Sequence, residues 1–118
     1  MVVGVCRIAL RIAGNDSLKG KRRVVRRIVD RTRNQFNAAV AEVADLDEHR
    51  RASIGFAVVS NDSRHANAML DNVVSFVAGL TEAEIVDRSM ELIHVGPQSD
   101  GGDFYVDEEN ADDEELES

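Results

Sequence analysis

Residues 17–36 read SLKGKRRVVRRIVDRTRNQF, and the rest of the chain is organised around this stretch. At about 100° per residue, its side chains separate onto two faces of a helix. The apolar face carries Leu18, Val25, Ile28, Val29, Thr32 and Phe36, and the opposite face carries Lys19, Arg23, Arg26, Arg27, Arg31 and Arg33. Asp30 is the only acid among these cations. We therefore expect one side of the helix to pack on a sheet while the other presents a row of cations to solvent.

The segments around this helix follow strand and helix patterns in turn. We expect strands at 1–12, 37–44, 53–60 and 83–95, where β-branched residues are dense or apolar and polar residues alternate. A second amphipathic helix follows the capping sequence Asn61-Asp62-Ser63. With right-handed crossovers, the order β-α-β-β-α-β predicts an α+β, ferredoxin-like sandwich. Its four-stranded antiparallel sheet has the spatial order 4-1-3-2, with two helices on one face.

The first strand has two different faces. Its even positions are the more apolar and should meet the helices: Val2, Cys6, Ile8, Leu10 and Ile12. Its odd positions place Val3, Val5 and Ala9 beside Arg7 and Arg11, and this face is too apolar to be simply solvated. We therefore expect a homodimer through the open sheet face, with the two arginines near acids such as Glu42 or Glu91.

Charge divides the chain into two parts. The 118 residues suit one domain, and the formal net charge is −8. All 14 basic residues precede Gly96, whereas ten of the 22 acids follow it, so the body carries +2 and the remainder −10. We expect a ferredoxin-like domain at 1–95 and a disordered acidic tail at 96–118.

Several classes of protein do not fit the sequence. Cys6 is the single cysteine, which excludes an internal disulfide, and His49 and His94 have no metal-ligand spacing with each other or with Cys6. We expect neither a metal nor a cofactor. Arg7 interrupts the apolar N-terminus, and no apolar run reaches the roughly 20 residues of a membrane helix, so we expect a cytoplasmic protein without a membrane partner.

The sequence also argues against an enzyme. Ser60, Ser63 and His65 lie close together, but catalytic triads assemble from separate segments, and helix capping explains residues 61–63. The loop at 14–17 lacks the phosphate-binding pattern Gly-x₄-Gly-Lys-Ser/Thr. An acylphosphatase-like reaction would need an arginine beside a glycine-rich loop that holds the phosphate. Arg11 lies near the loop at 14–17, but the glycine-rich motif is absent.

Two segments resemble a known family. MVVGVCRIALRI with NDSLKGKRRVV, and GFAVVSNDSRHANAMLDNVV, are similar to the YlxP-like family of small bacterial proteins, over about residues 1–95. The family's Ser-Leu-Lys-x-Lys-Arg motif is matched by Ser17, Leu18, Lys19, Lys21 and Arg22, and Gly20 departs from its usual helix-favouring residue. The resemblance implies a ferredoxin-like fold. It also implies a place near the ribosome, because the genes lie among ribosome-maturation genes and some members are described as ribosome-binding factors.

These observations favour an RNA-binding role. A row of cations attracts phosphates by counterion release, and arginine brackets phosphate oxygens. We expect a non-enzymatic factor that binds ribosomal RNA or the small ribosomal subunit, without reading DNA sequence. The candidate RNA-binding residues are Lys19, Lys21, Arg22, Arg23, Arg26, Arg27, Arg31 and Arg33. The alternatives are a plain solvated helix face, and a self-associating scaffold or small-ligand regulatory domain that uses the open sheet face.

The acidic tail yields a first prediction. We hypothesise that its carboxylates compete with RNA for the basic helix, at an effective concentration of about millimolar. Deleting residues 96–118 should raise RNA affinity strongly at low salt and little near 1 M, where the screening length is about 3 Å. Binding titrations at graded salt measure this. Because the deletion also removes ten negative charges, the control is the chemical shifts of residues 19–33. Unchanged shifts would contradict direct competition and leave the alternative, a solubilising appendage that touches nothing.

Overall fold

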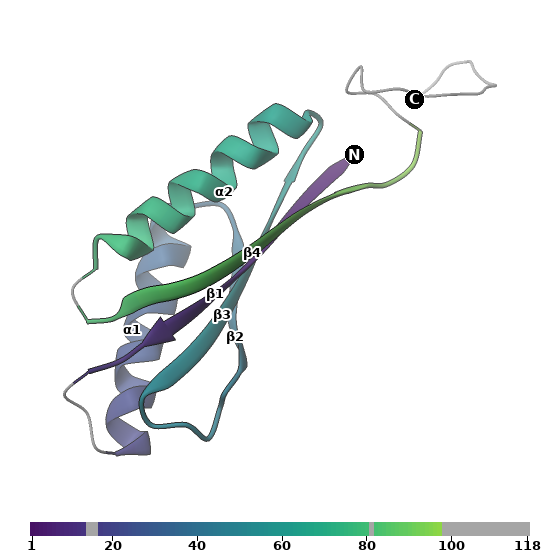
Figure 1. The fold of residues 1–118 in the computed structure, drawn as a ribbon. Coiled ribbons are helices and arrows are strands. Elements are labelled where there is room, and N and C mark those ends of the chain that lie inside the picture. The colour runs from purple at the N-terminus through teal and green to yellow at the C-terminus, as the bar shows by residue number, and fades with distance from the viewer. Residues whose placement is uncertain (14–16, 81, 98–118) are drawn as a thin grey trace.

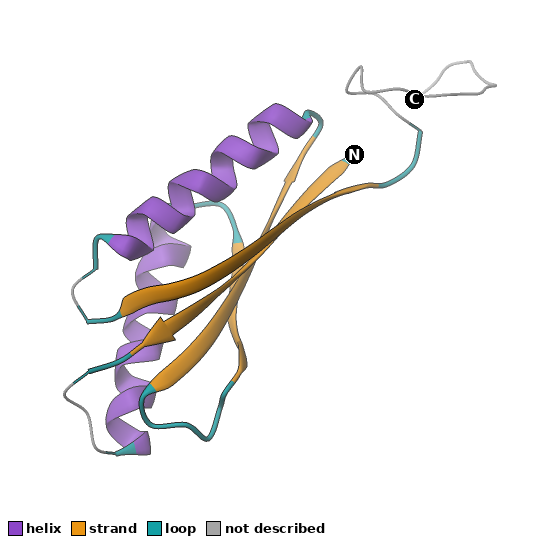
Figure 2. Ribbon diagram, viewed as in Figure 1, coloured by secondary structure: helices purple, strands orange, loops and turns teal. Residues whose placement is uncertain are grey.

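The computed structural model describes residues 1–13, 17–80 and 82–97. Its elements are β1 (Val2–Arg11), α1 (Leu18–Gln35), β2 (Ala39–Ala44), β3 (Arg51–Ser60), α2 (Ser63–Ala78) and β4 (Glu84–His94). The strands form one antiparallel sheet of order β2-β3-β1-β4, and both helices lie on the same side of it (Figure 1, Figure 2). This is the predicted order 4-1-3-2 read from the other edge, so the ferredoxin-like α+β fold is confirmed. Residues 14–16 of the predicted loop, and residues 98–118 of the predicted tail 96–118, lie outside the described residues.

Both helices begin at side-chain caps, and the cap of α2 lies within the predicted capping sequence Asn61-Asp62-Ser63. Ser17 is the N-cap of α1, and its hydroxyl accepts a hydrogen bond of 3.0 Å from the backbone N–H of Gly20. Asp62 is the N-cap of α2 and accepts one of 3.1 Å from the N–H of Arg64. Each cap satisfies a backbone donor that has no partner within the helix, which typically contributes about 1 kcal/mol.

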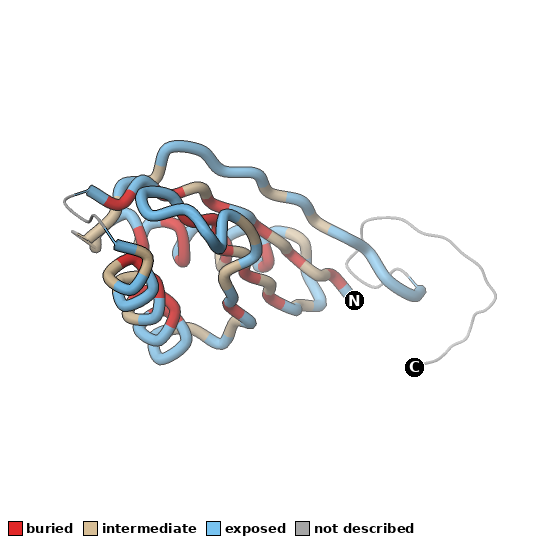
Figure 3. The backbone as a smooth tube through the Cα atoms, turned by 90° about the horizontal axis from the view of Figure 1, so that it is seen from below, coloured by how far each residue is buried: buried red, intermediate tan, exposed pale blue. Residues whose placement is uncertain are grey.

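The core lies between the helices and the even-numbered face of β1. Figure 3 shows the buried residues on the sides of the helices and strands that face one another. The five residues predicted to face the helices are at most 4% exposed, as predicted: Val2, Cys6, Ile8, Leu10 and Ile12. β3 contributes Ala52, Ile54, Phe56 and Val58; α1 contributes Val25, Ile28 and Val29; α2 contributes Ala66, Leu70, Val73, Val74 and Val77. The rings of Phe36 and Phe76 meet edge to face, with centroids 5.4 Å apart, and join the C-terminal ends of the two helices.

Gly4 sets how closely α2 approaches the sheet, because a β-carbon there would lie 3.0 Å from Leu70 Cδ1 and 3.2 Å from Val58 Cγ2. We predict that Gly4→Ala lowers the free energy of unfolding by about 1–2 kcal/mol through overpacking. Urea denaturation measures this. Gly79→Ala is the control, because Gly79 has helical backbone angles and its nearest atom would lie at 3.5 Å. Equal unfolding midpoints for Gly4→Ala and the parent would show that Leu70 moves aside without cost.

Candidate nucleic-acid interface

Seven of the eight candidate cations share the outer surface of α1. Val25, Ile28, Val29 and Thr32 face the core, and the opposite side of the helix is exposed. We call this surface the basic face of α1; it consists of Lys19, Arg22, Arg23, Arg26, Arg27, Arg31 and Arg33. From Lys19 to Arg33 it runs about 21 Å along the helix axis at about 1.5 Å per residue. Asp30 is also exposed there.

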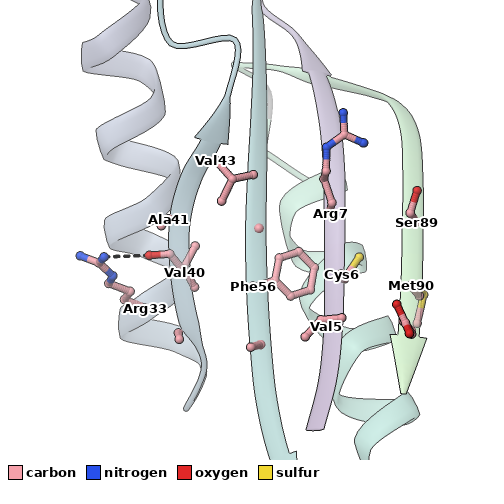
Figure 4. Close-up of a pocket in the computed structure, with 14 residues that line it drawn as sticks. Val5, Cys6, Arg7, Arg33, Val40, Ala41, Val43, Phe56, Ser89 and Met90 are labelled. Atoms are coloured by element: carbon pink, nitrogen blue, oxygen red, sulfur yellow. Dashed lines mark hydrogen bonds between the residues drawn. The ribbon is translucent and has the colours of Figure 1, made fainter. Parts of the chain in front are cut away.

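The two flanks of the basic face are anchored to neighbouring elements. Arg27 Nη1 lies 3.0 Å from Glu82 Oε2, and this hydrogen bond holds the pKa of the Glu82 carboxyl below its usual value. Arg33 Nη2 donates to the carbonyl oxygen of Val40 at 2.7 Å (Figure 4). In the part of the chain that the structure describes, no ion pair engages Lys19, Arg22, Arg23 or Arg26. These four cations are therefore available to an external anion.

Lys21 does not belong to this surface. Its side chain is 0% exposed, and its Nζ lies 2.6 Å from Glu42 Oε2 and 2.7 Å from the carbonyl oxygen of Asp45. The reason is helical position: Lys21 precedes Val25, Ile28 and Thr32 by four, seven and eleven residues, which places it on the buried stripe. The structure therefore removes Lys21 from the candidate RNA-binding residues. The spacing to Val25 and Ile28 was the sequence signal that could have shown this.

The Lys21 ammonium joins the first turns of α1 to the end of β2. Asp45 follows β2 and has a left-handed backbone, with φ of 61°. Its carbonyl oxygen accepts from Lys21, and its carboxylate accepts a 3.0 Å hydrogen bond from the Ser53 hydroxyl. Glu42 thus points to the helix side of the sheet, and the expectation that it pairs with Arg7 or Arg11 is wrong. Arg11 instead pairs with Glu84 at 3.0 Å, across the β1–β4 ladder.

The described residues offer neither a metal-binding cluster nor an accessible thiol. No group of three His, Cys, Asp or Glu side chains that could hold a metal occurs among residues 1–13, 17–80 and 82–97. Cys6 is 4% exposed, and burial raises the pKa of its thiol, as expected of a core residue.

One polar contact had no local signal in the sequence. Ser63 Oγ lies 2.9 Å from His94 Nε2, although 31 residues separate them. The contact fixes the end of β4 to the first turn of α2. A serine nucleophile also requires donors for an oxyanion, and this surface hydrogen bond alone does not supply them.

None of the helices among the described residues is long and apolar enough to cross a membrane. Residues 3–90 match the family model described as "Protein of unknown function (DUF503)". The chain belongs to this family. It is also 37% identical over 68 residues to "Uncharacterized protein YlxP" of Bacillus subtilis (strain 168), which covers 58% of this chain and 74% of that protein. The resemblance to the YlxP-like family is thus confirmed.

The buried ion pair yields a stability prediction. Lys21→Met should lower the free energy of unfolding by about 3 kcal/mol, because it leaves the Glu42 carboxylate without its partner in a largely buried position. Lys21→Met combined with Glu42→Gln should recover part of this loss, since it also removes the unpaired charge. Chemical denaturation of both variants measures the difference. Lys19→Met is the matched control on the exposed side and should change stability by less than about 0.5 kcal/mol. Equal losses for Lys19→Met and Lys21→Met would contradict a special role for the pair.

Proposed function

We propose that this DUF503 protein binds RNA through the basic face of α1 and acts as a non-enzymatic, cytoplasmic factor. Its target in this proposal is ribosomal RNA or the small ribosomal subunit during maturation. The observation that carries the proposal is the position of seven cations on one helix face, six of them exposed and Arg27 half-buried, with a single acid, Asp30, among them. The YlxP-like resemblance, with its ribosomal gene context, supports the choice of RNA.

The arrangement suits phosphate groups. Arginine offers two parallel N–H donors that match two phosphate oxygens, and Lys19, Arg22, Arg23 and Arg26 follow the helix axis from its first turn. The start of α1 adds backbone N–H groups that have no helical acceptor and the positive end of the helix dipole. Lys19 and Arg22 lie beside this end. An RNA backbone that runs along α1 would therefore meet cations from the first turn onward.

The aromatic residues indicate how RNA would be recognised. Phe56 is 3% exposed, and Phe36 and Phe76 pack against each other, so these rings are engaged in the core. Among the described residues, the open sheet face carries no aromatic side chain on which a base could stack, unlike an RNA-recognition motif. Recognition in this proposal depends on phosphate charge and on the shape of double-stranded regions, and not on base identity.

Replacing Arg23 and Arg26 with glutamine tests the basic face. Both side chains point away from the core, so the fold should persist. RNA affinity should fall similarly for every sequence, and the slope of log K against log salt should flatten by about 0.7 to 0.9 for each lost phosphate contact. Filter binding or fluorescence anisotropy at several salt concentrations, with duplex and single-stranded RNA, measures this.

The matched control changes the same net charge elsewhere. Arg64 on α2 and Arg88 on β4 are both exposed and lie outside the basic face. Arg64→Gln with Arg88→Gln should reduce RNA binding much less than the α1 pair does. If the two double variants bind RNA equally at every salt concentration, the effect is one of net charge, and the basic face is only a solvated surface.

A further inference from the structure

The face of the sheet opposite the helices is hollowed into a depression of about 660 Å³. All four strands line it, and Figure 4 shows Val43, Val5 and Arg7 among its side chains. We call it the sheet depression. The residues that give it its shape and charge are Val5, Arg7, Val43, Gly55, Ala57 and Glu91.

The sheet depression has a floor of small residues. Ala39, Ala41 and Ala57 lie on β2 and β3, around Gly55. A β-carbon at Gly55 would lie 3.0 Å from Val43 Cγ1, so glycine leaves room for the valine to lean over β3. Small side chains in the middle and larger ones at the border make a surface that a second apolar face can approach closely.

Exposed apolar residues extend this surface beyond the depression. Val43 is 52% exposed, Val59 62% and Ile93 40%. The strand register pairs Val3 with both Val59 and Ile93, which places all three on the same face. Contiguous apolar surface of this kind is uncommon on monomers and marks an interaction site.

The open face carries equal numbers of positive and negative side chains, and the two signs lie on different strands. Arg7, Arg11 and Arg51 lie on β1 and β3, whereas Glu84, Asp87 and Glu91 lie on β4, and the register aligns all six with the open face. Among the described residues, neither Arg7 nor Glu91 has an ion-pair partner. A face that carries equal numbers of both signs on different strands is complementary to a copy of itself turned by a two-fold rotation. It does not suit RNA, because β4 would repel phosphates.

The dimensions of the face also suit a second copy. Strands of 10 residues, as in β1 and β3, extend about 33 Å, and four strands span about 19 Å. The face therefore offers roughly 600 Å² per copy and roughly 1,200 Å² in total, which is the lower end of specific interfaces. Small-molecule sites, in contrast, are clefts that enclose most of the ligand, whereas this depression is spread across the strands.

We propose that a second copy of this chain covers the open sheet face and forms an isologous homodimer. The two sheets pack face to face about 10 Å apart, with their strands about 30° from parallel. Arg7 of each copy pairs with Glu91 of the second copy. The proposal does not depend on RNA binding, because the basic face of α1, apart from Arg33 at the border of the depression, lies outside the proposed interface.

Analytical ultracentrifugation of the full chain, from submicromolar to 100 micromolar, tests the proposal. The expected mass is twice that of the 13.0 kDa chain. Ala57→Glu should raise the dimer dissociation constant at least 100-fold, since it buries a carboxylate in the middle of the interface. Ala68→Glu on the exposed side of α2 is the matched control and should stay dimeric, and circular dichroism verifies that both variants are folded. A monomeric parent at 100 micromolar would overturn the proposal, as would a folded, dimeric Ala57→Glu variant.

A charge exchange tests the pairing between copies. Arg7→Glu and Glu91→Arg should each weaken the dimer at least tenfold, because each puts like charges together. The double variant should restore it. Failure of the double variant to recover would overturn the Arg7–Glu91 pairing. Native mass spectrometry tests the alternative, a small-ligand site on the open sheet face. A monomer that carries a co-purified small molecule would overturn self-association.

Discussion

Both helices bury their apolar stripes against the same face of one sheet. The basic face of α1 and the sheet depression both depend on this constraint. The side of α1 opposite the stripe must then face solvent, and the sequence fills it with arginine. The odd-numbered face of β1 lies on the far side of the sheet, where neither of the two helices in the described part of the chain covers it. A helix packed on that far side would cover the sheet depression.

The Lys21–Glu42 ion pair acts on position more than on total stability. A buried pair often stabilises no more than apolar residues of the same size would, because both charges lose their hydration. The contribution of the pair is to orient the start of α1. The ammonium has three donors, and Glu42 and the Asp45 carbonyl oxygen hold it from two sides. They thereby fix the first turns of α1 against the end of β2, and with them the direction in which Lys19 and Arg22 point.

Periodicity explains both what the sequence predicted and what it missed. Alternation in β1 and the spacing of Val25, Ile28 and Val29 were enough for the fold and for the buried faces. Lys21 was assigned from its charge, although the same spacing placed it inside. Other features depend on chain segments that only the tertiary fold brings together. The Ser63–His94 contact, the left-handed Asp45 and the β1–β4 irregularity between Ala9 and Leu10 have no local pattern that marks them.

The strand order also determines when the domain can form during synthesis. β1 emerges first, but it is a central strand, and its neighbours are β3 and β4. At about 5–20 residues per second, the ribosome needs roughly 2–10 s after Arg11 to reach Ser60 and roughly 4–17 s to reach His94. Until Ser60 is made, the valine-rich strand β1 has no sheet partner on either edge. The nascent chain is therefore most exposed to aggregation or chaperone binding at β1, while it is still attached to the ribosome.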